Sequence, residues 1–204
     1  MLAGRLSRKH FRGDKDCIWV NGVRATAKLV KLLLVQRVRP PANLYKLNSD
    51  ASLREGCAVG AVVVRDCEGK LVFAGYKEFG DVEVLVAKVL ALLVTLRMCA
   101  KRGFARFLIK VDSRLLTHLV SSRSAGKWPL CNALHQIHYW LKELWASLRH
   151  VYREANSTTD TIVTLDLGQD YVFDHVNQLP SLVRVALVFD AQAVPFVRVQ
   201  IVRE

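Results

Sequence analysis

Residues 44–79 read LYKLNSDASLREGCAVGAVVVRDCEGKLVFAGYKEF. Three runs in this stretch are rich in branched and aromatic side chains, at residues 44–49, 58–65 and 70–79. Polar turns that contain glycine separate them, at residues 54–56 and 66–69. Strands joined by such short turns normally pair with one another, so the stretch predicts an antiparallel meander that begins a sheet.

The chain after this meander alternates between helical and extended patterns. Residues 82–100 are apolar and rich in Leu and Ala, and they end at Lys101-Arg102-Gly103, which is typical of a helix C-terminus. Residues 106–112 and 148–153 predict strands, and helices are expected from Ser113, over 130–145 and over 159–167. Trp140 and Trp145 lie in a helical run and are expected in the core. This order predicts a mixed α/β domain.

Prolines set the start of that domain. Pro40 and Pro41 follow Arg39 and interrupt any helix, because proline lacks an amide donor. We therefore expect a basic N-terminal extension at residues 1–37, the domain at 38–168 and a C-terminal extension at 169–204. The apolar stretch 25–35 fits a helix or a strand equally well.

Composition limits the partners of this chain. The formal net charge is +12 and the pI is about 9.8, so nucleic acid is the first candidate partner and an anionic membrane surface the second. No apolar run reaches the ~18 residues that span a bilayer, so we expect no membrane span. We also expect a monomer. The first twelve residues are basic, which fits a plain basic tail or a weak organelle presequence.

The five cysteines form neither a disulfide framework nor a zinc site, since their number is odd and no Cys-x-x-Cys spacing occurs. Free thiols fit a reducing compartment, so we expect an intracellular protein, nuclear or cytoplasmic. These cysteines are Cys17, Cys57, Cys67, Cys99 and Cys131.

Two aspartates fall at predicted strand ends. Asp50 ends the first predicted strand and Asp112 the fourth. Strands joined by a crossover helix run parallel, so both carboxylates are expected side by side at one sheet edge, where divalent metal would bind. The alternative is that each aspartate is an ordinary turn residue.

Five short runs, taken in order, resemble the landmarks of the plant ribonuclease H-like, reverse-transcriptase-like domain. They are LNSDAS at 47–52, GAVVVRD at 60–66 with Gly69, AKVLAL at 87–92, VDS at 111–113 and RHVYREANSTTD at 149–160. The family patterns look like LNxDGS, GGVLRDxxG, AELxAL, VxxDS and HVxREANxxAD. The REAN run with Asp160 at the expected spacing is the most specific of them.

This resemblance implies a ribonuclease H-like fold with a five-stranded mixed sheet, order 3-2-1-4-5, and helices on both faces. It also implies that four carboxylates hold two Mg²⁺ ions, and that these ions catalyse cleavage of the RNA strand of RNA–DNA hybrids. Asp50, Asp112 and Asp160 match the first, third and fourth carboxylates, as catalytic and metal-binding residues. His150 matches a histidine that assists proton transfer or product release, although a backbone-bonded strand histidine is an equal alternative. Asn156 matches an asparagine of the same loop.

The chain departs from the family at the second carboxylate, where Lys88 replaces a glutamate. At ~4 Å and an effective dielectric of about 20, an ammonium and one Mg²⁺ repel by roughly 8 kcal/mol. Glu83, about 140° away around the helix, faces elsewhere and cannot substitute. The apolar run 84–86 offers no minor-groove hydrogen bonds, and Ala51 replaces the usual glycine.

A basic group with one tryptophan is the candidate nucleic-acid surface. Near one sheet edge it would track phosphates and stack a base, although a solvated basic face is equally compatible with the pattern. Together with Asn156, the residues proposed to bind nucleic acid are Lys101, Arg102, Arg106, Lys127 and Trp128.

We therefore expect a ribonuclease H-like domain that binds RNA–DNA hybrid or RNA, with Mg²⁺ as the implied cofactor and with turnover impaired by Lys88. An active Mg²⁺-dependent hybrid ribonuclease is one alternative. A non-catalytic protein-interaction module or the remnant of a mobile element is another.

Overall fold

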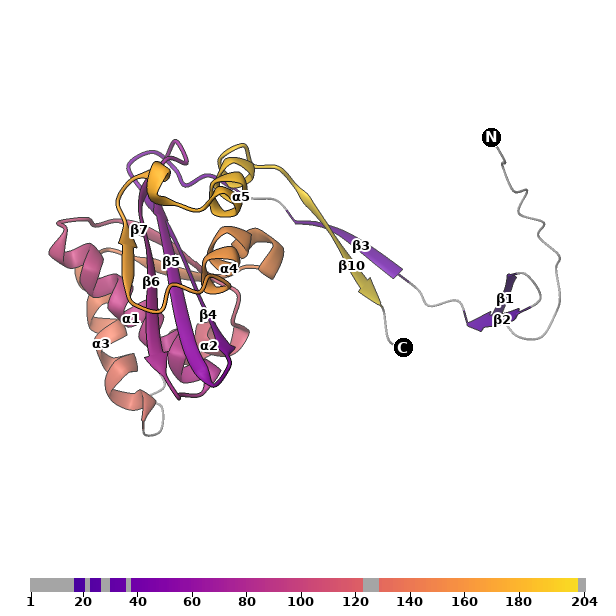
Figure 1. Ribbon diagram of the computed structural model, residues 1–204, viewed down its shortest axis with the longest axis horizontal. Coiled ribbons are helices and arrows are strands. Elements are labelled where there is room, and N and C mark those ends of the chain that lie inside the picture. The colour runs from indigo at the N-terminus through magenta and orange to yellow at the C-terminus, as the bar shows by residue number, and fades with distance from the viewer. Residues whose placement is uncertain (1–16, 21–22, 27–29, 36–37, 123–128, 202–204) are drawn as a thin grey trace. The chain divides into compact units, whose positions relative to one another are not determined.

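The computed structural model describes residues 17–20, 23–26, 30–35, 38–122 and 129–201. The chain forms two compact units, Met1–Leu34 with Val197–Glu204 and Val35–Phe196. In the smaller unit β1 (Cys17–Val20) pairs antiparallel with β2 (Val23–Thr26). Strand β3 (Val30–Val35) pairs with β10 (Phe196–Ile201), so the undecided stretch before Val35 contains a strand (Figure 1).

The larger unit is built on a six-stranded mixed sheet of order β8-β7-β4-β5-β6-β9 (Figure 1). Its central strand β4 pairs antiparallel with β5 and parallel with β7. The five predicted strands are adjacent in the predicted order, which confirms the mixed α/β fold. The expected count of five was too low, because β9 pairs with β6 and adds an edge strand. The strands are β4 (Tyr45–Arg54), β5 (Cys57–Arg65), β6 (Leu71–Gly80), β7 (Phe107–Val111), β8 (Ser147–His150) and β9 (Tyr171–Phe173).

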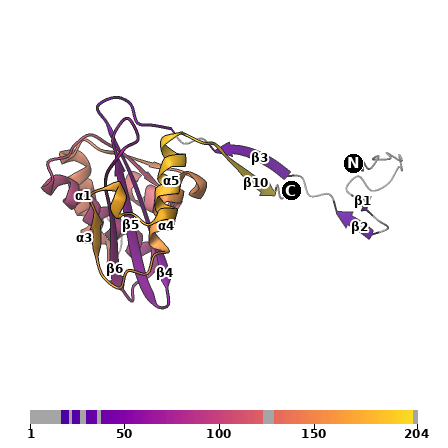
Figure 2. The ribbon, with the colours of Figure 1, turned by 45° about the horizontal axis from the view of Figure 1, so that its top comes forward.

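Helices cover both faces of the sheet, as Figure 2 shows. On one face α1 (Val84–Lys101), α2 (Arg114–Ser121) and α3 (Leu130–Glu143) bury the large apolar cluster that contains Phe73, Leu92 and Ile109. On the other face α4 (Ser157–Val163) and α5 (Ser181–Ala191) bury a second cluster around β5 and β6. No described helix is long and apolar enough to cross a membrane.

Strand β4 is longer than the sequence suggested, because it continues through Asp50 to Arg54. The two-residue turn Glu55-Gly56 has left-handed φ angles of 47° and 81°, which suit a tight hairpin and extend the ladder to Arg54 and Cys57. Pairing with β7 nevertheless ends at Ser49 and Val111. The edge at which the carboxylates emerge is therefore set by the end of β7, not by the end of β4.

Part of the stretch that we treated as a C-terminal extension packs into the larger unit. After β9 come the 3-10 turn η2 (Val176–Gln178) and α5, which contributes Val183 and Leu187 to the second apolar cluster. Asp190 at the end of α5 is buried and pairs with Lys46 at 3.3 Å and with Arg65. These apolar and ionic contacts fasten residues beyond Gly168 to the sheet.

One core prediction was wrong. Trp145 is 76% exposed, because α3 ends at Glu143 and Trp145 takes a left-handed φ of 50° in the connection to β8. Trp140 packs against the large apolar cluster as a partly buried residue.

Candidate functional site

Lys88 joins the two aspartates that follow the paired parts of β4 and β7. Its Nζ lies 2.8 Å from Asp50 Oδ1 and 2.7 Å from Asp112 Oδ1. Asp50 is 5% exposed and also accepts the backbone N–H of Ala51 at 2.8 Å. The predicted side-by-side placement of Asp50 and Asp112 is present, and the ammonium of Lys88 lies between them.

Burial and charge shift the pKa values of this group. Burial raises the pKa of Asp50 to about 6 against the attraction of Lys88, and the neighbouring Asp112 carboxylate adds to the rise. Burial alone would lower the pKa of Lys88, but Asp50 and the hydrogen bonds to both carboxylates outweigh it and raise that pKa. Lys88 therefore remains a cation at neutral pH.

Replacing Lys88 with methionine should destabilise the chain more at high pH than at low pH. The raised pKa means that ionisation of Asp50 opposes folding as pH rises from about 4 to 6, and Lys88 offsets part of this cost. Without the ammonium, the pKa of Asp50 should rise beyond 6 and two charged carboxylates would repel. Denaturant unfolding at pH 5 and pH 8, with a carboxyl NMR titration, measures the effect. An equal loss of unfolding free energy at pH 5 and pH 8 would show that Lys88 does not offset the ionisation of Asp50.

Asp160 is not placed to bind the same metal ion as Asp50 and Asp112. It lies on α4 and accepts hydrogen bonds from Arg153, at 2.9 Å from Nε and 2.6 Å from a terminal nitrogen. Arg153 also responds to the charges of Asp50 and Asp112, which raise its pKa after the larger effect of Asp160. The three aspartates were expected to converge on a metal ion, but each instead forms an ion pair with Lys88 or Arg153. The three carboxylates and two cations together carry a net charge of −1.

Arg153 is a site residue that the sequence analysis missed. A signal was present, because Arg153 begins the REAN run and precedes Asp160 by seven residues. It lies in the 3-10 turn η1 (Arg153–Asn156), and α4 follows directly.

The hydrogen bonds of His150 and Asn156 are made within the protein. His150 Nε2 lies 3.2 Å from the carbonyl oxygen of Asp112, which fits the backbone-bonded alternative. Asn156 is 1% exposed; it accepts from Asn48 Nδ2 at 2.7 Å and donates to the Ser49 carbonyl at 3.3 Å. A side chain this buried anchors the loop to β4, so the expected contact of Asn156 with nucleic acid does not fit the structure.

The remaining nucleic-acid candidates are placed unevenly. Lys101, Arg102 and Arg106 are all exposed, and Arg102 also packs over the Phe73 ring and pairs with Asp174. Lys127 and Trp128 lie outside the described residues.

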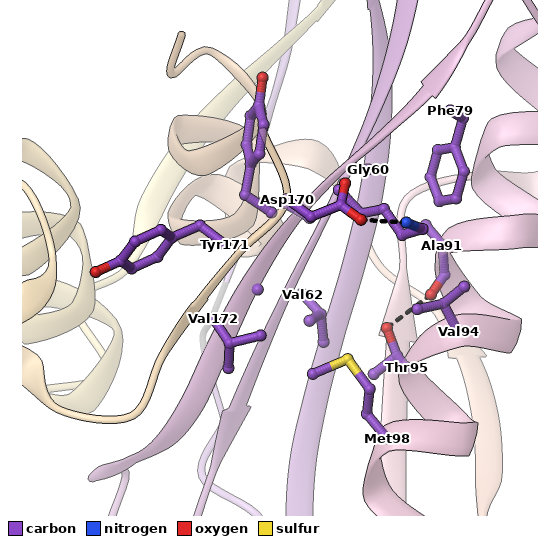
Figure 3. A pocket seen from close by; sticks show the side chains of 14 residues that line it. Gly60, Val62, Phe79, Ala91, Val94, Thr95, Met98, Asp170, Tyr171 and Val172 are labelled. Carbon is purple, nitrogen blue, oxygen red and sulfur yellow. Dashed lines mark hydrogen bonds and ion pairs between the residues drawn. The ribbon is translucent and has the colours of Figure 1, made fainter. Parts of the chain in front are cut away.

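Figure 3 shows an apolar pocket of about 220 Å³, and Asp50, Asp112 and Asp160 are not among the residues that line it. It is lined by β5, β6, β9 and the α1 residues Ala91, Val94, Thr95 and Met98. A Cβ on Gly60 would come within 2.6 Å of the Phe79 ring and 2.7 Å of Ala91 Cβ, so glycine is required there for α1 to approach β5. The pocket offers little chemistry beyond the ion pair of Asp170 with Lys77.

The residues at this site do not fit a two-ion metal centre. Within the described ranges, no group of three or more His, Cys, Asp or Glu side chains is placed to hold a metal ion. The ammonium of Lys88 and the guanidinium of Arg153 take up the carboxylate oxygens that a hard cation would need.

The larger unit is similar to solved ribonuclease H structures. The N-terminal RNase H domain of a Mycobacterium tuberculosis protein, solved as a fusion with maltose-binding protein, is 21% identical with a TM-score of 0.53, covering 58% of this chain and 89% of that one. LC11-RNase H1, isolated from compost by a metagenomic approach, is 22% identical with a TM-score of 0.53, covering 59% and 92%. The structure of LC11-RNase H1 in complex with an RNA/DNA hybrid gives 20% identity, a TM-score of 0.52 and coverage of 58% and 92%.

These likenesses show that the larger unit has the ribonuclease H fold. The reverse transcriptase-like family model matches residues 48–165, more than half of the chain, and the chain belongs to this family. A search of curated proteins finds no match.

Proposed function

We propose that this chain is a ribonuclease H-like domain that binds nucleic acid without efficient turnover. The observation that carries the proposal is the position of Lys88 Nζ, 2.8 Å from Asp50 and 2.7 Å from Asp112. An ammonium there neutralises the carboxylates that the family uses for chemistry, and Arg153 does the same for Asp160. Lys88 thus makes the site an internal ion-pair cluster.

Binding is the part of the family function that this chain retains in our proposal. The net charge of +12 favours a polyanion, and LC11-RNase H1 was solved with an RNA/DNA hybrid. We infer that the natural ligand is RNA–DNA hybrid or RNA, and that the chain belongs to the plant branch of the family because of its motif spacing. The compartment we infer is nuclear or cytoplasmic.

Affinity for hybrid should fall steeply as salt is raised from about 50 to 200 mM, because phosphate contacts release condensed counterions. Hybrid and duplex RNA should bind almost equally, since Val84, Leu85 and Val86 offer no minor-groove donors or acceptors. Fluorescence anisotropy with labelled hybrid and duplex RNA measures both quantities. A flat salt response, or a strong preference for hybrid, would count against the proposal.

A further inference from the structure

Strands β7 and β8 have one face that points away from α1, α2 and α3, and we call it the open β7–β8 face. Phe107, Ile109 and Val111 point into the cluster beneath α1, α2 and α3. The alternation of a strand therefore turns Leu108 and Lys110 to the opposite face. The apolar cluster on that face contains residues of β5, β6 and β9 but none of β7 or β8. Helices α4 and α5 thus leave this part of the sheet without apolar cover.

Two like charges lie opposite each other on that face. Lys110 on β7 is in register with Arg149 on β8, and Arg149 is exposed. Directly opposed like charges destabilise a sheet, with Cβ atoms only about 5 Å apart. Burial and the charge of Arg149 lower the pKa of Lys110. Neither cation forms an ion pair with a carboxylate in the part of the chain that the structure describes, in contrast to Lys88, Arg102 and Arg153.

An exposed aromatic side chain lies at the beginning of the same strands. Trp145 precedes β8 by two residues, is largely exposed and has a φ of 50°. Arg106 immediately precedes β7, is exposed, and has a φ of 67°. The Arg106 N–H donates to the Leu144 carbonyl at 2.7 Å, so the two strained positions are neighbours. Bulky residues in left-handed backbone cost energy and concentrate at ligand sites.

We propose that the open β7–β8 face, with Arg106 and Trp145 at its beginning, binds single-stranded nucleic acid. This inference rests on the proposed nucleic-acid binding and adds a surface to it. Lys110, Arg149 and Arg106 contact phosphates, and Trp145 stacks on an unpaired base. A duplex is excluded from the stacking contact, because its bases are already stacked on each other.

The dimensions of the surface suit a short strand. Trp145 and Arg149 are four positions apart, which is at most about 13 Å at the extended rise of about 3.3 Å per residue. A stacked strand places a phosphate about every 3.4 Å, so this distance accommodates up to about four nucleotides. An anionic strand would also relieve the repulsion between Lys110 and Arg149.

The test is anisotropy of labelled dT12 and rU12 oligonucleotides titrated with the full chain. Trp145→Ala should weaken binding roughly 5- to 150-fold, the range for one base–aromatic stack, and Trp145→Phe should retain most of the affinity. Lys110→Gln with Arg149→Gln should make the log–log salt slope shallower by about 1.4, or 0.7 per phosphate contact. The matched control is Arg54→Gln with Lys70→Gln, which removes the same charge from the end of β4 and from the β5–β6 turn and should leave the slope unchanged.

Each result decides between the two proposals. If the wild-type chain binds oligonucleotide and Trp145→Ala and the Lys110/Arg149 pair bind as tightly, the surface is wrong and general nucleic-acid binding stands. If the control pair changes the slope as much as the Lys110/Arg149 pair, charge alone acts and the surface is again wrong. A wild-type chain that binds neither single strand nor hybrid overturns both proposals. Tighter binding of a labelled poly-glutamate peptide than of either oligonucleotide would overturn the surface in favour of an acidic protein partner.

Discussion

Replacing Asp190 with asparagine is expected to lower the free energy of unfolding by about 3–5 kcal/mol, the cost of breaking a buried ion pair from one side. Asp190 pairs with Lys46 and Arg65, and all three side chains are almost completely buried. Asparagine keeps the shape but removes the charge, so two buried cations lose their counter-ion. Urea denaturation measured on the full chain gives the difference.

An exposed ion pair provides the matched control. Asp174 pairs with Arg102 at the surface, and Asp174→Asn should change stability by only about 0–1 kcal/mol. Replacing Asp190 with leucine together with Arg65→Met and Lys46→Met should recover much of the loss, because apolar side chains need no counter-ion. Equal, small effects of Asp190→Asn and Asp174→Asn would show that α5 is not held to the sheet by its charge.

The buried pair also connects α5 to the site. Arg65 donates to Asn48 Oδ1 at 2.6 Å, and Asn48 donates to Asn156 at 2.7 Å. Asn156 in turn donates to the Ser49 carbonyl, next to Asp50. The loop that carries Arg153 is therefore fixed to β4 by a chain of hydrogen bonds that begins at the C-terminal helix.

The second large effect is expected for Lys88→Glu, which should raise Mg²⁺ affinity at least about thirty-fold and produce a trace of hybrid cleavage. The substitution removes the ammonium between Asp50 and Asp112 and adds an oxygen ligand, and the net charge of the cluster changes from −1 to −3. Relief of about 2 kcal/mol, a quarter of the roughly 8 kcal/mol repulsion at ~4 Å because a flexible lysine can swing away, corresponds to that thirty-fold gain. Calorimetric titration with Mg²⁺ measures the affinity.

Cleavage by Lys88→Glu should stay far below that of an efficient ribonuclease. Ala51 and the apolar run at 84–86 remain, and a misplacement of ~1 Å costs about a hundred-fold in rate. Lys88→Arg keeps the positive charge and should gain nothing, while Asp50→Asn added to Lys88→Glu should remove the gain. If Lys88→Arg gained as much as Lys88→Glu, charge would not explain the effect.

The sequence predicted the parts of the structure that depend on local pattern. The strand meander, the α1 helix and the parallel pairing of β4 with β7 follow from periodicity and element order. The position of Lys88 beside Asp50 and Asp112 follows from the family resemblance. Trp145 was misplaced because an apolar pattern continues past the point at which a left-handed residue ends the helix. Nothing local distinguishes those two outcomes.

Ion pairs between residues far apart in the chain could not be predicted from the sequence. The pairing of Arg65 with Asp190 joins residues far apart in the chain, and no spacing rule links a strand arginine to a helix aspartate. Arg153 was quoted within its motif, but its pairing with Asp160 depends on the geometry of η1 and α4. For the same reason, the expected convergence of Asp160 with Asp50 did not take account of a second cation.

The most direct measurement of the central claim is a Mg²⁺ titration of the wild-type chain on one labelled RNA–DNA hybrid, with bound and cleaved fractions followed in the same tube. With the Lys88 ammonium between Asp50 and Asp112, the account predicts that hybrid is bound without any need for Mg²⁺ and that no Mg²⁺-dependent product accumulates. Cleavage by the wild-type chain as fast as by Lys88→Glu would contradict it, because the lysine would then be harmless to catalysis.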